Sequence, residues 1–344
     1  MTIPTLKIGG FEWENALLLA PMEGITDLPF RIICKHMGAD LVYTEFISSE
    51  AIIRDVDKSI SKMIIDDSER PAAVQIFGAR IEAMTEAAKI CEDHGADIID
   101  INYGCWVKKV VNNNSGAAYL KDINRMAETT RAVAEAVSVP VTVKTRLGWD
   151  DENIVIVEAT KLLNETGAQA LTVHCRTRNM GMKGHAEWSW IPHIKEVAKM
   201  PIILNGDVTT PIEAKKAFDT TGCDAVMIGR AAVGNPFLFR DVRNYLDNGA
   251  DAEIITPETR IEYCKKHLNL ALQYRGFPRG MYEFRKHYSG YLKGLYYGAN
   301  VRQELVEMET KEEIFKKLDE YLEFLNNRPP KPSYSPAETD TDSQ

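Results

Sequence analysis

The 344-residue sequence lacks several patterns that would assign a protein to a class at once. It has no Cys-x-x-Cys pair, which argues against a disulfide framework and against a zinc or iron–sulfur site, so no metal is expected. No apolar run approaches the roughly 20 residues that a membrane helix needs. The first residues lack the basic start and apolar stretch of a secretory signal. The default expectation is a cytoplasmic protein with reduced thiols. The six cysteines are at positions 34, 91, 105, 175, 223 and 264.

Two common nucleotide-binding loops are also missing. No GxGxxG leads from a strand into a helix, and no GxxxxGK[ST] is present, which disfavours a Rossmann domain and a phosphate-binding P-loop. The 50 acidic residues outnumber the 41 basic ones, and the formal net charge of −9 opposes binding to a polyanion on average. A local basic face could overrule that average. The composition, 44% hydrophobic and 26% charged, is typical of a globular enzyme.

What the sequence does contain is eight short apolar runs, most of them separated by a helical pattern. Each run is nearly continuous in apolar residues, as expected for strands of a parallel sheet that is covered on both faces. Eight strand–helix units predict a (β/α)8 TIM barrel of the α/β class, whose active site is built from the carboxyl ends of the strands. The runs lie at residues 17–22, 41–46, 72–78, 98–104, 141–148, 170–176, 201–207 and 225–231.

The rest of the chain predicts two further parts. Residues 1–245 are expected to form the catalytic barrel. Residues 246–328 contain long helical stretches without a strand, which predicts a smaller all-helical domain. Residues 329–344 are rich in proline, serine and acidic residues and are expected to form a disordered tail.

Polar residues at the ends of the predicted strands indicate a phosphorylated, flat cofactor. Loops after the seventh and eighth strands commonly hold a phosphate in this fold, and Gly206, Gly229 and Arg230 fit that role. Lys144 lies in an apolar run, where an unpaired ammonium would be costly, so we expect an anionic or electron-rich partner. Lys144 and Gln75 are placed to meet the polar edge of a ring, although Gln75 could merely cap its strand. Flavin mononucleotide (FMN) would satisfy these groups together.

Cys105 stands just past a glycine, where the fourth predicted strand ends, within DINYGCWVKKVVNNNSGAA (100–118). A structural cysteine normally lies inside the apolar run itself. This position therefore predicts that the thiol of Cys105 has a functional role.

Several motifs in a fixed order resemble the tRNA-dihydrouridine synthases, most closely the bacterial B-type branch. They are APMEGITDLPFR, VQIFG, DINYGC with VKKV, VTVKTRLGW, HCRTR, NGD and MIGRA. The resemblance begins at about Leu17, runs to the end of the eighth strand and resumes weakly at FRKHYSGYLKG. It implies an FMN-dependent barrel with a helical carboxyl-terminal domain. Such an enzyme reduces the 5,6 double bond of particular uridines in RNA, with NADPH as the electron source.

The resemblance also carries residue roles onto this sequence. The catalytic cysteine falls on Cys105, which would donate the proton to C5 of uracil after hydride reaches C6. A thiol with an ordinary pKa near 8.5 is protonated at neutral pH and can make that donation. One departure is Trp106, where the family usually has proline, and this residue could stack on a base or pack on the barrel rim. The cofactor contacts fall on Pro21, Met22, Glu23, Gln75, Lys144, His174, Asn205, Gly206, Asp207, Gly229 and Arg230.

A uridine in folded RNA must be drawn out of its stack before it can enter a barrel, so cations are expected around the barrel mouth and on the second domain. Tyr288, Tyr291 and Tyr296 suit stacking on splayed bases, although tyrosines at helical spacing often form a core. The candidate RNA-binding cations are Lys108, Lys109, Arg146, Arg176, Arg178, Lys183, Arg285, Lys286 and His287.

Two alternatives remain open at this point. An FMN barrel could reduce a small molecule, as a dihydroorotate or enoate reductase does, which would leave the basic helical domain without a purpose. The other alternative is a relative that binds RNA without catalysing a reaction, and Trp106 is the only residue that suggests it. The expected partner is tRNA or another structured RNA, and the sequence does not name the uridine.

Overall fold

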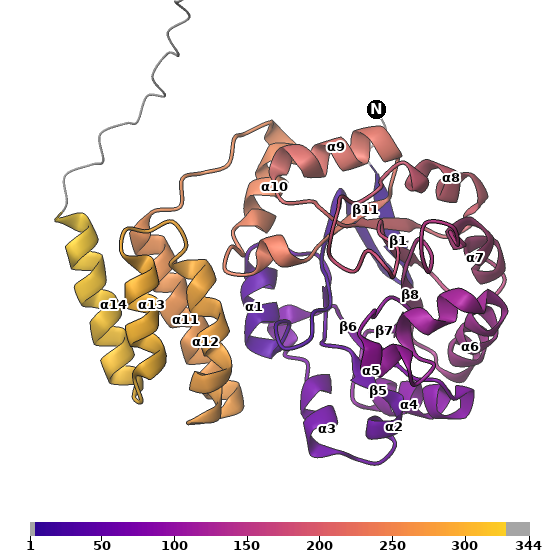
Figure 1. The fold of residues 1–344 in the computed structure, drawn as a ribbon, viewed down its shortest axis with the longest axis horizontal. Coiled ribbons are helices and arrows are strands. Elements are labelled where there is room, and N and C mark those ends of the chain that lie inside the picture. The colour runs from indigo at the N-terminus through magenta and orange to yellow at the C-terminus, as the bar shows by residue number, and fades with distance from the viewer. Residues whose placement is uncertain (1–3, 328–344) are drawn as a thin grey trace, which may run out of the picture.

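Eight parallel strands form a barrel in the computed structural model, which describes residues 4–327 (Figure 1). The strand order is β3-β11-β10-β9-β8-β7-β6-β4, and a parallel bridge between Leu18 and Leu41 joins the two ends of this path. The predicted (β/α)8 barrel is therefore confirmed. The strands are β3 (Ala16–Leu19), β4 (Val42–Tyr43), β6 (Ala72–Phe77), β7 (Ile98–Asn102), β8 (Val141–Arg146), β9 (Leu171–His174), β10 (Ile202–Asn205) and β11 (Ala225–Ile228).

Each predicted strand overlaps one of these eight strands, but the observed strands are shorter. The difference lies mainly at their carboxyl ends, where polar residues and glycines leave the ladder to form the loops of the active-site face. Gly206 is one example, since it directly follows the last residue of β10, and Gly104, two residues after the end of β7, is another. The predicted tail at 329–344 lies outside the described residues.

An amino-terminal hairpin that the sequence analysis did not predict closes the opposite end of the barrel. It consists of β1 (Thr5–Ile8) and β2 (Phe11–Glu14), paired antiparallel around a Gly9-Gly10 turn. Leu6 and Ile8 are fully buried and belong to the apolar cluster inside the barrel. A further short strand, β5 (Ile47–Ser48), pairs with β6. Because one end is plugged, access to the interior is from the carboxyl ends of the strands.

Helices surround the barrel on its outside (Figure 1). Their apolar faces pack on the outward-facing strand residues to form the largest hydrophobic cluster. These helices are α1 (Leu28–His36), α2 (Ser49–Ile52), α3 (Asp57–Met63), α4 (Ile81–Asp93), α5 (Lys108–Val111), α6 (Ile123–Ala136), α7 (Ile156–Leu163), α8 (Trp190–Val197), α9 (Pro211–Thr221) and α10 (Leu238–Asn248), with 3-10 turns η1 (Asp67–Glu69), η2 (Gly116–Lys121) and η3 (Arg230–Ala232).

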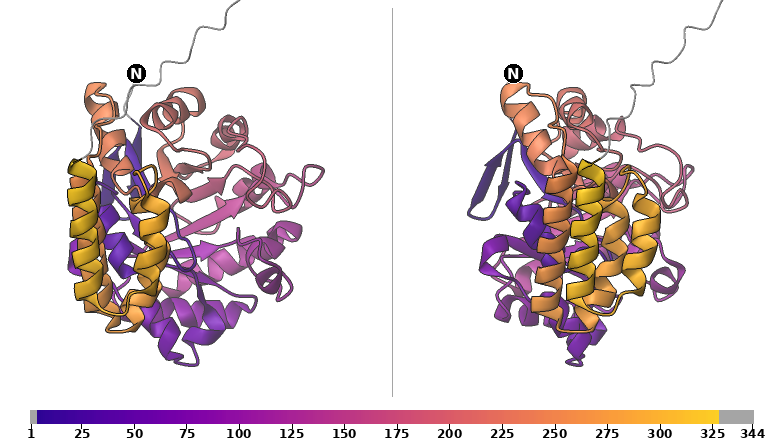
Figure 2. Two further views of the ribbon diagram at one scale, coloured as in Figure 1. Left: turned by 60° about the vertical axis from the view of Figure 1, so that its left-hand side comes forward. Right: turned by 90° about the vertical axis from the view of Figure 1, so that its left-hand side faces the viewer.

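Four carboxyl-terminal helices form a bundle beside α1 (Figure 1), and Figure 2 shows the four helices side by side. The helical bundle has a hydrophobic cluster of its own, separate from those of the barrel. Its helices are α11 (Pro257–Arg275), α12 (Arg279–Tyr291), α13 (Gly298–Glu307) and α14 (Lys311–Asn326). Since α10 runs through residue 245 and packs on α9, the connection to the bundle begins at Gly249. No helix among residues 4–327 has the length and apolar character to cross a membrane.

Candidate active site

The carboxyl ends of the strands open on a cavity of about 270 Å³, here called the barrel mouth. Loops from six of the eight barrel strands contribute to its lining. All of the residues predicted from the resemblance to contact the cofactor or act in catalysis line it, except Gln75. These residues are Pro21, Met22, Glu23, Cys105, Lys144, His174, Asn205, Gly206, Asp207, Gly229 and Arg230.

Gln75 is not among the residues that line the cavity, so its predicted contact with the edge of a ring stays a prediction. It is fully buried, and its Nε2 donates to Asp100 Oδ2 at 2.6 Å. Its Oε1 accepts from Asn102 Nδ2 at 2.8 Å. Because both ends of the amide are used inside the protein, Gln75 positions Asn102, and Asn102 lines the mouth.

Asn102 shapes the loop that carries Cys105, a role that the sequence analysis missed. Its Oδ1 accepts from the backbone N–H of Gly104 at 3.0 Å and from that of Cys105 at 2.8 Å. Asn102 is the last residue of β7, so it ties the loop to the end of a rigid strand. Its position at a predicted strand end was the only signal, because polar residues at strand ends are common for structural reasons.

Cys105 is 9% exposed and lies in the wall of the mouth. Burial raises the pKa of its thiol above the ordinary value, and this effect outweighs the lowering by a backbone N–H and by Arg146. The thiol is therefore protonated at neutral pH.

Next to Cys105, Trp106 is 41% exposed, and its ring lies against Gly181, where an added Cβ would come within 3.5 Å of the ring. Trp106 therefore packs on the barrel rim and still presents part of its ring to solvent.

Lys144 projects from β8 toward Asn205, and its Nζ donates to Asn205 Oδ1 at 2.9 Å. Asn205 in turn donates to the Met227 carbonyl at 2.8 Å. Burial, and to a smaller extent the nearby Arg146, lower the pKa of Lys144 to about 8. An ammonium held this way at the barrel mouth keeps donors for a ligand that accepts hydrogen bonds or carries negative charge.

The loop after β10 is held in place by Asp207. Both carboxylate oxygens accept from Arg176 Nη2, at 2.8 and 2.6 Å, and Oδ2 also accepts from the Ala186 N–H at 2.7 Å. Although burial raises the pKa of Asp207, these bonds outweigh it and hold the pKa below the ordinary value. Gly206 has φ +119°, and a Cβ there would come within 2.9 Å of Ala186 Cβ. Only glycine fits this position without strain.

Arg230 and His174 flank the same loop. The Arg230 guanidinium is 56% exposed, with Nη2 3.7 Å from Asp207 Oδ1, so most of its donors face the open mouth. His174 lies at the end of β9, with Nε2 3.4 Å from Arg176 Nη1. Burial, followed by the surrounding arginines and Lys144, holds the pKa of His174 well below its ordinary value. The ring is therefore neutral at physiological pH.

Arg146 and Arg176 are not exposed cations, which corrects the expectation that they face RNA. Each is 2% exposed. Arg146 donates to the carbonyls of Gly104, Thr177 and Gly181, at 2.9, 3.0 and 2.8 Å. Because Gly104 precedes Cys105 directly, Arg146 fixes the cysteine loop against the loop that follows β9. Both arginines position loops, which the sequence could not show because their partners, backbone carbonyls for Arg146 and the Asp207 carboxylate with two carbonyls for Arg176, come together only in the fold.

The remaining predicted cations differ in exposure. Lys108, Lys109 and Lys183 are exposed, and Arg178 is half-buried. On α12, Arg285 is half-buried, and its guanidinium lies 4.6 Å from the centre of the Tyr282 ring. Lys286 places Nζ 3.7 Å from Asp27 Oδ2.

His287 and two of the tyrosines lie in the interior. His287 is 1% exposed, and Tyr288 and Tyr291 are fully buried. This corrects the expectation that they meet RNA, because their rings pack in the core of the helical bundle and against α1. Tyr296 is 38% exposed.

A basic groove beside the mouth adds residues that the sequence analysis did not single out. Lys121 Nζ lies 3.8 Å from the centre of the Trp149 ring, and Arg178 Cζ lies 4.5 Å from it. Arg125, Asn112 and Asn114 line the same groove. Trp149 directly follows a predicted strand, but only the fold brings these cations to its ring.

This fold and this site define an α/β-barrel enzyme whose polar groups converge on one mouth, and comparisons with known proteins give the family. The family model for dihydrouridine synthase (Dus) matches residues 18–327. The tRNA-dihydrouridine synthase B of Proteus vulgaris is 41% identical over 321 residues, which cover 92% of this chain and 98% of the relative. A probable tRNA-dihydrouridine synthase of Rickettsia bellii is 38% identical over 324 residues, with 94% and 99% covered.

The chain belongs to the dihydrouridine synthase family, and within it to the B-type branch, as the resemblance predicted. Members of this family are enzymes of the oxidoreductase class, which confirms the expectation of an enzyme. Among solved structures, morphinone reductase in complex with tetrahydroNAD aligns with a TM-score of 0.52 and 15% identity, covering 75% of this chain and 93% of that one. At this identity the likeness shows the barrel fold alone.

Proposed function

We propose that the protein reduces the 5,6 double bond of particular uridines in tRNA to give dihydrouridine, using FMN at the barrel mouth and NADPH as the electron donor. The observation that carries this proposal is the placement of a protonated thiol, Cys105, in the wall of a cavity that also presents Lys144 and Arg230. The names of the relatives support the reaction and the substrate.

The residues at the mouth fit FMN. A flavin phosphate needs cations and close backbone approach, and Arg230 offers a largely exposed guanidinium beside Gly206 and Gly229. The isoalloxazine ring offers carbonyl oxygens and ring nitrogens, which match the ammonium of Lys144 and the amide of Asn205. His174 lines the same cavity as a neutral ring. FMN, when bound and reduced, would supply the hydride for C6 of uracil.

The chain's own contribution to the chemistry is the proton at C5. Hydride addition at C6 leaves negative charge on C5 and O4, and the C5 carbon then takes the proton from Cys105 Sγ. Burial favours this step because it keeps the thiol protonated until the base enters. Asn102 and Arg146 hold the backbone on either side of Gly104, so the sulfur is presented at a fixed position. Solvent later restores the proton on sulfur.

Binding of tRNA is proposed to use local cations despite the acidic average. Lys108 and Lys109 follow the catalytic loop and are exposed, and Lys183 lies on the neighbouring loop. The basic groove around Trp149 extends this face on the same side of the mouth. We also propose that the helical bundle, residues 249–327 in the structure, contributes to RNA binding. The exposed face of Trp106 is available for stacking on the extruded base or its neighbour.

Incubation of the purified protein with NADPH and unmodified tRNA tests the proposal. Dihydrouridine should form at specific positions, as mass spectrometry of the digested tRNA would report. Dihydroorotate and small enones should be turned over far more slowly. If small enones are reduced and tRNA is not, the protein is a small-molecule reductase on the same barrel. If a flavin is bound but neither substrate is reduced, the result would favour the alternative in which the protein binds RNA without catalysing a reaction.

A further inference from the structure

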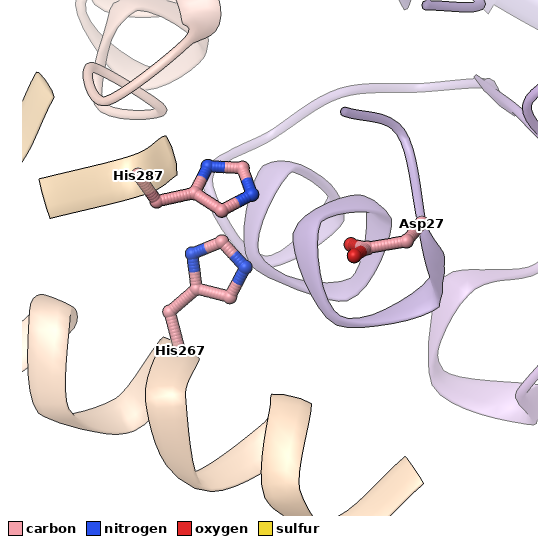
Figure 3. Close-up of side chains that lie close together, drawn as sticks. All are labelled: Asp27, His267 and His287. Atoms are coloured by element: carbon pink, nitrogen blue, oxygen red, sulfur yellow. The ribbon is translucent and has the colours of Figure 1, made fainter. Parts of the chain in front are cut away.

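Three ionisable side chains from distant parts of the chain converge where the barrel meets the helical bundle (Figure 3). Asp27 precedes α1, His267 lies in α11 and His287 lies in α12. One carboxylate oxygen and one nitrogen of each ring lie within 4.8 Å of one another. The three residues, here called the His–Asp cluster, are 6%, 1% and 1% exposed.

His287 carries the strongest sign of a missing ligand. Among residues 4–327, neither Nδ1 nor Nε2 of His287 has a hydrogen-bond partner, and both atoms are buried. Folded proteins rarely leave a buried polar group unpaired, so such a group needs an explanation. Figure 3 shows one nitrogen of His287 and one of His267 facing the side of the cluster on which Asp27 lies.

His267 is held in the way that metal-bound histidines usually are. Its Nδ1 lies 3.1 Å from the hydroxyl oxygen of Tyr291, which can accept the ring proton. A histidine that donates from one nitrogen keeps the lone pair of the other nitrogen for a ligand. Phe30 stacks on both imidazoles, with ring centres 5.7 Å from His267 and 5.2 Å from His287. This apolar wall fixes the rings and restricts the access of water.

We propose that Asp27, His267 and His287 bind a divalent transition-metal ion of the zinc type. Two imidazoles and one carboxylate are a donor set that Zn²⁺ accepts, with water as the fourth ligand. Zinc bonds of about 2.0–2.1 Å place tetrahedral ligand atoms about 3.4 Å apart, so binding would draw the three groups together by about an ångström. Because Asp27 belongs to the barrel and the histidines belong to the bundle, the ion would fasten the two parts. The absence of a Cys-x-x-Cys pair says nothing about such a site.

Nearby charges define what competes with the ion. Lys286 places Nζ 3.7 Å from Asp27 Oδ2, and its side chain is 30% exposed, so the ammonium can turn toward solvent. Asp27 also accepts from the Phe30 N–H at 3.2 Å through Oδ1. Arg275 and Glu45 lie farther out and pair with each other at 4.0 Å. Lys286 is thus the cation that a metal would have to displace, and its removal should tighten metal binding.

Zinc titration of the full-length protein, first stripped with a chelator, tests the proposal. The parent should bind about one equivalent of Zn²⁺. His287→Ala and Asp27→Asn should each weaken binding by about 100-fold or more, since even the loss of an outer-shell partner costs 10- to 100-fold. Asparagine keeps the helix cap that Asp27 provides, so this variant separates loss of the ligand from loss of the fold. His193→Ala, at an exposed histidine on α8, is the matched control and should bind as the parent does.

Lys286→Gln should bind Zn²⁺ several-fold more tightly than the parent, an effect that a purely structural cluster would not give. Cobalt in place of zinc should show the visible absorption of a four-coordinate site, and His287→Ala should lose it. A parent that binds no zinc, or zinc binding that survives both His287→Ala and Asp27→Asn, overturns the proposal. Either result would leave the proposed reaction at the barrel mouth untouched, because none of the three residues lines that cavity.

Discussion

The barrel mouth and the interface between α1 and the helical bundle both bury ionisable groups, but they use them differently. At the mouth, the charged groups that position the loops are paired: Arg146 binds three carbonyls, and Arg176 binds Asp207 through two hydrogen bonds. At the interface, the imidazole of His287 has no hydrogen-bond partner among the described residues. The paired groups build the walls of a cavity, whereas the unpaired ring lies with its ligand atom within 4.8 Å of those of Asp27 and His267.

The comparison predicts that substitutions at the mouth change chemistry with little effect on folding. The largest effect is expected for Cys105→Ala. Dihydrouridine formation should fall by roughly 10²-fold or more, the scale of losing a positioned acid, while NADPH still reduces the bound flavin. Stopped-flow absorbance and nucleoside mass spectrometry measure the two steps separately. Cys264→Ala, at a buried cysteine of the helical bundle, is the control and should keep full activity.

Retention of the cofactor should depend on the cations of the mouth. Lys144→Ala and Arg230→Ala should each weaken FMN binding by about 10- to 150-fold, since a hydrogen bond to a charged group contributes about 1.5–3 kcal/mol. Flavin absorbance after dialysis is the measurement. Lys183→Ala, at an exposed lysine nearby, should stay as yellow as the parent. If both mouth variants also stay yellow, the cofactor assignment is wrong.

The affinity for RNA should depend on the exposed cations and not on the buried ones. Reversing the charge of both Lys108 and Lys109 to glutamate should weaken tRNA affinity by roughly tenfold and lower the salt slope by about one per lost phosphate contact. Fluorescence titrations at several salt concentrations measure both quantities. Reversing both Lys215 and Lys216 to glutamate, on the outer helix α9, makes the same charge change away from the mouth and should alter neither. An unchanged slope in the double variant would place the RNA elsewhere.

The smallest effect is expected for Trp106→Pro, which installs the residue that the family usually has. The cysteine and its positioning partners remain, so activity should stay within a few-fold of the parent's. Mapping of dihydrouridine positions in tRNA would show whether the choice of uridine shifts. Complete loss of activity would mean that the Trp106 ring, which packs on Gly181, is essential to the loop of this chain.

Most of the barrel could be predicted because each strand is a local apolar run with a polar residue at its end. The roles of those polar residues could not all be predicted, since Gln75 and Arg146 have the same local pattern as Lys144. Their hydrogen bonds go to Asp100, Asn102 and loop carbonyls that only the closed barrel brings near.

The amino-terminal hairpin and the His–Asp cluster were missed for related reasons. The hairpin strands are only four residues long, so their alternation is weak. Asp27 lies far along the chain from His267 and His287, and no spacing rule links them. The sequence did not decide whether Tyr288 and Tyr291 are buried, because their helical spacing fits both stacking on bases and packing in a core.

The pH dependence of a single turnover tests the central claim most directly. Pre-reduced enzyme is mixed with unmodified tRNA, and flavin reoxidation is followed as pH is varied. A proton donor must be protonated, and burial raises the pKa of Cys105, so the parent's rate should fall above the ordinary thiol range near pH 8.5. Any change caused by Lys144, whose pKa is about 8, should appear equally in the parent and in Cys105→Ser, so the comparison of the two enzymes isolates the thiol. Cys105→Ser should react slowly and without that fall. A Cys105→Ser enzyme that reoxidises as fast as the parent, with the same pH profile, would contradict the assignment of Cys105 as the proton donor.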